Sequence, residues 1–170
     1  MTGRTAGEDR EMRLGKSGIV ALFAFALGGC GMTASPADGL AFQAPSGWQS
    51  SPGIMGFMQF WRAPSDDREV LMLFKSPKPL KAEDVFSDAR LKDTLKNVTV
   101  ERRSGIEICD HQPATYVQAR GSSSHGGDEF VDLVLTTLNG NSYLAMYVRP
   151  ISTPTNPMAA AALREVCTKS

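Results

Sequence analysis

Two apolar segments in the C-terminal part of the 170-residue chain are separated only by Asn139-Gly140-Asn141. These segments span residues 130–138 and 142–148, and each is long enough to form a strand. Asn and Gly tolerate the positive φ angles that a tight hairpin turn demands, so an Asn-Gly pair between apolar runs favours a hairpin. The sequence therefore predicts an antiparallel strand pair here, and a fold built around an antiparallel sheet.

Further segments rich in apolar and β-branched residues extend the predicted sheet. Residues 54–61 are apolar on both faces of the expected strand, which is typical of strands that are covered on both sides. The small and polar residues 121–127 predict a loop. The additional predicted strands comprise residues 40–44, 54–61, 70–74, 98–100, 106–108 and 114–119.

Two helices complete the predicted elements. Apolar side chains recur near helical spacing between residues 81 and 95, which indicates an amphipathic helix. Asn156 and Pro157 are the residue types that favour the N-cap and the first turn of a helix, so a second helix is predicted for residues 158–167. The order of strands, helix, strands and helix defines an α+β domain with an antiparallel sheet.

The N-terminal region has the layout of an export signal. Residues 19–27 are uninterrupted apolar residues, preceded by Arg13 and Lys16 and followed by Leu27-Gly28-Gly29-Cys30. This apolar run is too short to cross a bilayer, because a spanning helix needs about 20 such residues. The tetrad resembles the lipobox of bacterial lipoproteins, in which the cysteine is acylated and becomes the new N-terminus.

This resemblance divides the chain into three predicted regions. Residues 1–29 form a signal peptide, residues 30–39 a flexible tether lipidated at Cys30, and residues 40–170 a single α+β domain. Residues 1–11 contain more acidic than basic side chains, whereas an export signal begins with a positive segment, so Met12 is an alternative start. An ordinary cleaved signal, or a short buried helix that ends at Cys30, is the other interpretation of this region.

The charge of the chain restricts its partners. Lys and Arg number 18 and Asp and Glu number 18, whereas nucleic-acid-binding domains normally carry a basic excess, so no nucleic-acid partner is expected. Membrane attachment is expected through the lipid on Cys30 and not through a basic patch. The predicted location is the bacterial cell envelope, with the domain facing the periplasm or the exterior.

Cysteine usage agrees with export. Once Cys30 is acylated, Cys109 and Cys167 remain, and an even pair in a small exported domain is most simply a disulfide. The alternative is a metal site that uses Cys109 and His111. A Cys-x-His spacing without a second pair of ligands is a weak zinc pattern, so no metal and no cofactor are expected.

A search for catalytic residues leaves only His111 and His125 as candidate imidazole bases. No Gly-x-Ser-x-Gly motif is present. His125 lies in a glycine-rich segment between Ser122 and Asp128, where side chains are not held to the tolerance that catalysis requires. The chain is therefore predicted not to be an enzyme, and a hydrolase that uses His125 or His111 is the alternative.

Residues 54–61 also provide the candidate binding surface. This surface consists of Met55, Phe57, Met58 and Trp61, and methionine-rich apolar surfaces adapt to varied partners. The alternative interpretation is that this strand is simply part of the core. The charged segments Arg102-Arg103 and Asp66-Asp67-Arg68 are interpreted as a solvated strand end and a turn.

Several short phrases resemble the PsbP-like family. Its opening phrase Phe-x-x-Pro-x-Gly-Trp matches residues 42–48, its Pro-Ala turn before a strand matches residues 113–117, and the hairpin before its last long strand matches residues 139–143. The resemblance covers residues 40–167 and extends to bacterial lipoproteins of the DcrB-like kind. It implies a sandwich of an antiparallel sheet with helices on its faces, and a binding or assembly role without catalytic residues.

The sequence as a whole predicts a membrane-anchored exported lipoprotein. Its domain is expected to act as a non-catalytic binding or assembly accessory at the cell envelope. The expected partner is an envelope protein or a hydrophobic ligand. A purely structural subunit of an envelope complex is a further alternative.

Overall fold

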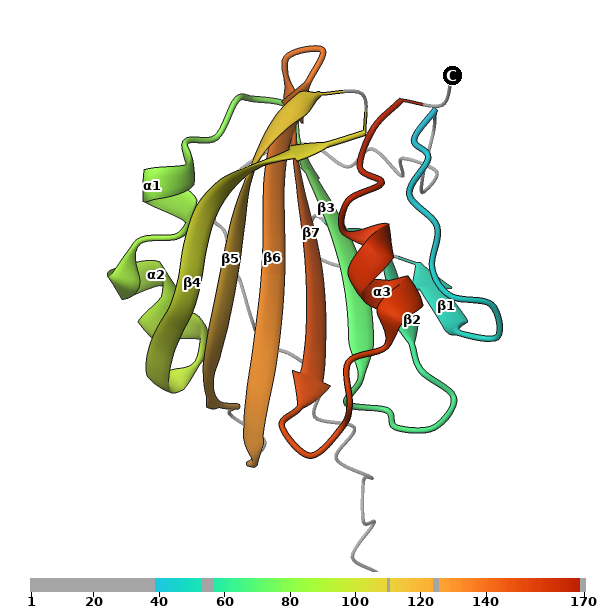
Figure 1. Ribbon diagram of the computed structural model, residues 1–170, viewed down its shortest axis with the longest axis vertical. Helices are drawn as coiled ribbons and strands as arrows, with labels where there is room; N and C mark the ends of the chain where they lie inside the picture. Colours follow the sequence, from blue (N-terminus) through green and yellow to red (C-terminus); the bar gives the residue numbers. More distant parts are fainter. Residues whose placement is uncertain (1–38, 53–56, 110, 124–125, 169–170) are drawn as a thin grey trace, which may run out of the picture.

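The computed structural model describes residues 39–52, 57–109, 111–123 and 126–168. Its main feature is one seven-stranded antiparallel sheet with the strand order β1-β2-β3-β7-β6-β5-β4 (Figure 1). The strands are β1 (Gln49–Pro52), β2 (Phe57–Arg62), β3 (Val70–Ser76), β4 (Lys96–Ile108), β5 (Gln112–Ser122), β6 (Asp128–Leu138) and β7 (Asn141–Pro150).

The predicted hairpin lies at the centre of the sheet as β6 and β7. Asn139 and Gly140 form its turn with φ angles of +50° and +78°, and the register runs without a shift from Leu138 opposite Asn141 to Glu129 opposite Pro150. The predicted α+β class with an antiparallel sheet is therefore confirmed.

Helices cover the two faces of the sheet. The short helices α1 (Ala82–Val85) and α2 (Asp88–Thr94) pack on one face, and α3 (Pro157–Ala162) packs on the other (Figure 1). Each face has its own apolar core, because side chains alternate along the strands. We refer to these as the α1–α2 face and the α3 face.

The predicted helix over residues 81–95 is two helices. Ser87 separates them, because its side chain accepts a hydrogen bond from the amide of Arg90 and caps α2. The second predicted helix begins as expected, with the Asn156 side chain accepting from the amides of Met158 and Ala159. It ends at Ala162, five residues earlier than predicted.

Three strand predictions are corrected. Residues 40–44 do not form a strand, and only Leu40 makes an isolated bridge, to Thr168. Residues 98–100 and 106–108 belong to a single strand, β4, which is 13 residues long. Strand β1 was not expected from the sequence at all, because its residues are small and polar.

A disulfide joins the C-terminal segment to the turn between β4 and β5. Cys109 and Cys167 lie 58 residues apart and are bonded, as predicted. The carbonyl of Cys167 also accepts a 2.7 Å hydrogen bond from the amide of Ala41. The first described residues of the domain are thus held beside its last ones.

Substitution of Gly121 in β5 tests how closely the junction between α2 and β4 packs against β5. A Cβ atom there would lie 2.8 Å from both the Leu95 Cβ and the Lys96 carbonyl oxygen, so Gly121→Ala is expected to lower the free energy of unfolding by about 1–3 kcal/mol. Gly105→Ala in β4 is the matched control, because nothing lies within 4 Å of its Cβ position. Urea denaturation measures both, and equal stabilities of the two variants would contradict the packing.

Candidate functional site

A β-bulge in β4 brings polar side chains onto the α3 face. The register between β4 and β5 shifts between Val100 and Arg102, and Arg102 then lies opposite Gln118. Bulges bend a strand and redirect its side chains, and they are frequent next to functional sites. The side chains of this region form a cluster that we call the β4–β6 polar cluster: Glu101, Arg102, Tyr116, Gln118, Arg120 and Asp132.

Asp132 of β6 is the centre of this cluster. Its side chain is only 6% exposed, and its Oδ1 accepts hydrogen bonds from the Tyr116 hydroxyl and, at 2.8 Å, from Gln118 Nε2. A buried carboxylate is costly unless donors satisfy it. The two neighbouring side chains on β5 supply these donors because Gln118 lies directly opposite Asp132 and Tyr116 lies diagonally to it.

The ionisation of Tyr116 is shifted by this environment. Burial raises the pKa of Tyr116 above its ordinary value of 10, and the hydrogen bond to Asp132 raises it further. The hydroxyl therefore stays protonated at neutral pH and donates to the carboxylate. Such a tyrosine serves as a hydrogen-bond donor, and a nucleophile or general base would need the opposite shift.

Arginine side chains surround Tyr116. The Arg102 guanidinium carbon lies 5.7 Å from the centre of the Tyr116 ring, and Arg102 and Arg164 both act electrostatically on the Tyr116 hydroxyl. Arg120 Nε lies 3.2 Å from Glu101 Oε1. Within the described part of the chain, neither Arg102 nor Arg164 forms an ion pair with a carboxylate. Arg102 thus lies over an aromatic ring without a direct ion-pair partner among the described residues.

A second tyrosine–carboxylate pair continues the polar row across the sheet. Tyr147 lies opposite Asp132 in the β6–β7 register, and its hydroxyl donates a 2.6 Å hydrogen bond to Glu69 Oε1. The same hydroxyl accepts from the amide of Asn156 at 3.0 Å. Burial and the Glu69 hydrogen bond raise the pKa of Tyr147. This pair fixes the start of the α3 segment and is fully enclosed.

The disulfide excludes the predicted metal alternative at Cys109. The Cys109 sulfur is bonded to Cys167 and is not free to ligate a metal with His111. Among residues 39–52, 57–109, 111–123 and 126–168, no three His, Cys, Asp or Glu side chains form a group that could hold a metal ion. Asp110 and Cys30 lie outside the described residues.

Of the two candidate catalytic histidines, the structure describes His111 and not His125. His111 Nδ1 lies 2.8 Å from Glu107 Oε2, and the two side chains are 89% and 69% exposed. His125 lies outside the described residues. Its neighbours Ser122 and Asp128 are cross-strand partners, and the Ser122 hydroxyl donates directly to Asp128 Oδ1 at 2.7 Å. A triad would require the imidazole between these two side chains.

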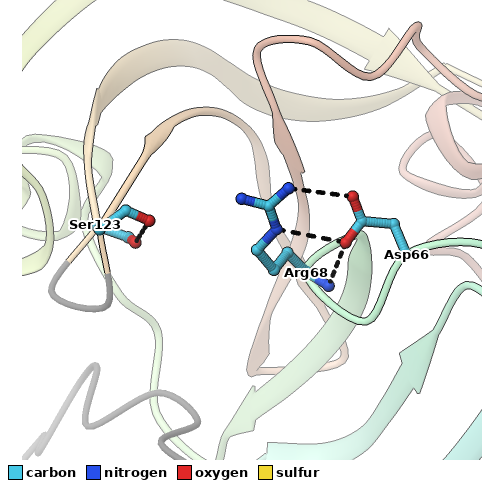
Figure 2. Close-up of polar contacts among 4 residues, drawn as sticks. Asp66, Arg68 and Ser123 are labelled. Atoms are coloured by element: carbon cyan, nitrogen blue, oxygen red, sulfur yellow. Dashed lines mark hydrogen bonds and ion pairs between the residues drawn. The ribbon is translucent and has the colours of Figure 1, made fainter.

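The end of the sheet near this segment is formed by loops. Figure 2 shows the Asp66–Arg68 pair in the turn between β2 and β3, and Ser123 at the β5–β6 connection. The Arg68 amide donates to Asp66 Oδ1 at 3.0 Å, and this bond, with the guanidinium contacts, lowers the pKa of Asp66. The segment Asp66-Asp67-Arg68 is a turn, as predicted.

The structure describes only part of the predicted apolar binding surface. Trp61 is 7% exposed, and its ring lies 5.3 Å from that of Phe42 in the core of the α3 face. Phe57 and Met58 lie in β2, and Met55 lies outside the described residues. For Trp61 the structure therefore supports the core interpretation.

An open groove lies on the opposite, α1–α2 face. Its volume is about 270 Å³, and it is bounded by the connection to α1 and by the ends of β5 and β6 nearest the disulfide. The lining residues are Leu80, Ala82, Gln112, Pro113, Ala114, Thr115, Leu135, Thr136 and Thr137. The lining carries no ionisable side chain, so the groove offers neither an acid nor a base.

Sequence reasoning missed the β4–β6 polar cluster. Arg102 was interpreted as part of a solvated strand end, but it lies in the middle of β4. One signal was available in the sequence. Asp132 is the only charged residue between residues 130 and 138, and the four residues nearest to it, 130, 131, 133 and 134, are apolar. The alternation of Tyr116, Gln118 and Arg120 with small apolar residues also indicated a polar face.

Comparison with known proteins identifies the fold. No protein-family profile matches the sequence, and no curated protein sequence matches it. The solution structure of cyanobacterial PsbP (CyanoP) from Synechocystis is similar, with a TM-score of 0.50 and 16% identity over 74% of this chain and 87% of that chain. The predicted PsbP-like fold is confirmed at this level.

A crystal structure from Bacteroides thetaiotaomicron shows the same likeness. Its TM-score is 0.50 with 12% identity, over 74% of this chain. This chain spans 43% of that longer protein. At such identities the similarity shows the fold alone. In the described residues, no helix combines the length and apolarity needed to cross a bilayer.

Alkaline titration tests the two tyrosine–carboxylate pairs. Tyr116 and Tyr147 are two of the three tyrosines, and their absorbance is expected to change only above pH 10 in the folded protein. Because both pKa values are raised above the unfolded value, the unfolded chain loses these protons first as the pH rises. The contribution of these two tyrosines to the free energy of unfolding is therefore expected to be constant below pH 10 and to fall above it.

Asp132→Asn provides the specific control. It removes the charge beside Tyr116 and should move only the Tyr116 transition back toward pH 10, while Tyr147→Phe removes the other transition. An ultraviolet absorbance titration measures both. A single transition of the folded wild type at pH 10 would contradict the assignment.

Proposed function

We propose that this protein is a membrane-anchored lipoprotein of the bacterial cell envelope whose domain binds a partner without catalysing a reaction. The export signal ends at Cys30, within a tetrad that resembles a lipobox. The expected lipid on Cys30 is the anchor. The domain faces the periplasm or the exterior and acts as a binding or assembly accessory.

The observation that carries this proposal is the distribution of the three cysteines. Cys109 and Cys167 form the disulfide, and Cys30 remains, two glycines after the apolar segment. Disulfides persist in oxidising compartments outside the cytosol, so the bond supports export independently of the N-terminal pattern. Two unrelated features of the chain therefore favour the same location.

The chemistry of the β4–β6 polar cluster supports binding over catalysis. Tyr116 remains a protonated donor, and Asp132 is held by hydrogen bonds in a buried position. Arg102 is exposed beside them without a carboxylate partner in the described residues. Exposed arginine next to an aromatic ring is a common recognition surface. The likeness to CyanoP is compatible with this role but concerns the fold alone.

The proposed tether keeps the domain near its membrane. Gly39 lies nine positions after Cys30, and a fully extended chain over these positions reaches about 30 Å. Gly39 precedes Leu40, which bridges to Thr168 beside the disulfide. The expected partner is therefore another envelope protein or a hydrophobic ligand near the bilayer.

Expression of the full chain beside Cys30→Ala tests the anchor. Wild type is expected in the membrane fraction with lipid mass on Cys30 and no free thiol, whereas Cys30→Ala stays unprocessed because the acylated atom is missing. Ser35→Ala in the tether is the matched control and should behave as wild type. Intact mass, fractionation and thiol counting are the measurements. An unlipidated wild-type chain outside the membrane fraction would contradict the proposal.

A further inference from the structure

Strand β4 forms one edge of the sheet. The strand order places β5 on one side of β4 and no strand on the other side among the described residues (Figure 1). Every second residue of an edge strand directs its amide and carbonyl away from the sheet, where another extended chain can pair with them. At 13 residues, β4 is the longest strand, so this edge is extensive.

The two halves of this edge differ. Residues 96–101 contain both register shifts, and irregular pairing is one way in which proteins protect an edge from strand addition. In the other half, the Arg103 side chain donates a hydrogen bond to the Phe86 carbonyl and forms an ion pair with Asp88 of α2, on the face opposite Arg102. From Arg102 opposite Gln118 to Ile108 opposite Gln112, the register is regular. Residues 102–108 are thus the half of the edge that is suited to accept a strand.

The α3 face of this regular half carries only positive charge. Its side chains on that face are Arg102, Ser104, Ile106 and Ile108, and Arg164 lies on the segment that covers the face. Neither arginine forms an ion pair with a carboxylate in the described residues. The acidic Glu107 lies on the other face, where it contacts His111.

One hydroxyl group on this face also lacks a hydrogen-bond partner among the described residues. Ser104 Oγ is buried and has no hydrogen-bond partner in the described part of the chain. Ser104 lies opposite Tyr116, and Arg102 lies over the Tyr116 ring. A carboxylate on an added strand would find the exposed Arg102 guanidinium without an ion-pair partner among the described residues. Hydrogen bonds between charged partners are among the stronger ones in proteins.

From these observations we propose that residues 102–108 of β4 bind an extended acidic segment of a partner protein by strand addition. The main chain of β4 pairs with the segment, and Arg102 and Arg164 select acidic side chains on the α3 face. A second copy of this chain fits less well, since residues 102–108 of its own β4 present Arg102 and no carboxylate on that face, and Glu101 already pairs with Arg120. This inference rests on the binding role proposed above and names its partner.

Binding of synthetic peptides to the full chain in detergent tests the proposal. The probe is a labelled peptide of alternating Thr and Glu, and its counterpart alternates Thr and Lys. Fluorescence anisotropy should show binding of the Glu peptide alone. Arg102→Glu and Arg164→Glu should each weaken it at least about tenfold, because each loses a charge-assisted hydrogen bond and gains a repulsion.

Lys92→Glu is the matched control for net charge. Lys92 is exposed on α2 and away from the α3 face, so Lys92→Glu should leave the affinity unchanged. Arg102→Gln keeps the length of the side chain without its charge and serves if Arg102→Glu fails to fold. Equal weakening by the Arg102 and Lys92 variants would reduce the effect to bulk charge and overturn the proposal.

Hydrogen exchange locates the peptide. The bound Glu peptide should slow exchange at outward-facing amides of residues 102–108, and protection elsewhere, or none, would overturn the proposal.

Vesicles of phosphatidylglycerol are a second probe. Binding of these vesicles that depends on Arg102, without binding of the Glu peptide, would assign the arginines to lipid headgroups instead. Intact mass measures the lipid on Cys30 separately from peptide binding. A chain that lacks the lipid and a chain that does not bind the peptide are therefore distinguishable results.

Discussion

The pairing of β6 with β7 supports the rest of the structure. These two strands lie inside the sheet, with β3 beside β7 and β5 beside β6, and nine residues of β7 in succession are buried. Side chains that alternate along the pair enter both apolar cores, so the same register positions the cover on each face. A slip of one residue would also move Asp132 and Tyr147 off the α3 face, which would leave Tyr116 and Glu69 without their partners.

The polar residues of the α3 face follow from this register. Asp132 and Tyr147 face each other across the central pair. Asp132 forms a tyrosine–carboxylate hydrogen bond with Tyr116 of β5, and Tyr147 forms one with Glu69, which directly precedes β3. Buried carboxylates are tolerated because donors satisfy them, and this requirement restricts which residues can flank them. One pair is enclosed beneath the start of α3. The other lies beside the arginines near the edge, where the bulge in β4 makes the surface polar.

Much of the fold was predictable from local pattern, and the exceptions have physical reasons. The 81–95 pattern is apolar at helical spacing, but the Ser87 side chain caps a new helix there, and its hydrogen bond competes with a continuous helical backbone. Residues 40–44 alternate like a strand, yet their place beside Cys167 is outside the sheet. Of the predicted site residues, the bonded cysteines were predictable from the even pair that remains beside Cys30, whereas Arg102, Tyr116 and Asp132 meet only through pairing across three strands.

The sequence by itself determined the antiparallel hairpin, the α+β class and the disulfide pair, because each depends on neighbouring residues or on a count of residues. Tertiary structure alone decided which strand became the edge, where β4 bulges and which charges remain unpaired. These features depend on residues that are distant in sequence. Arg102 and Asp132 are 30 positions apart by their numbers, and only the register of β4, β5 and β6 brings them onto one surface.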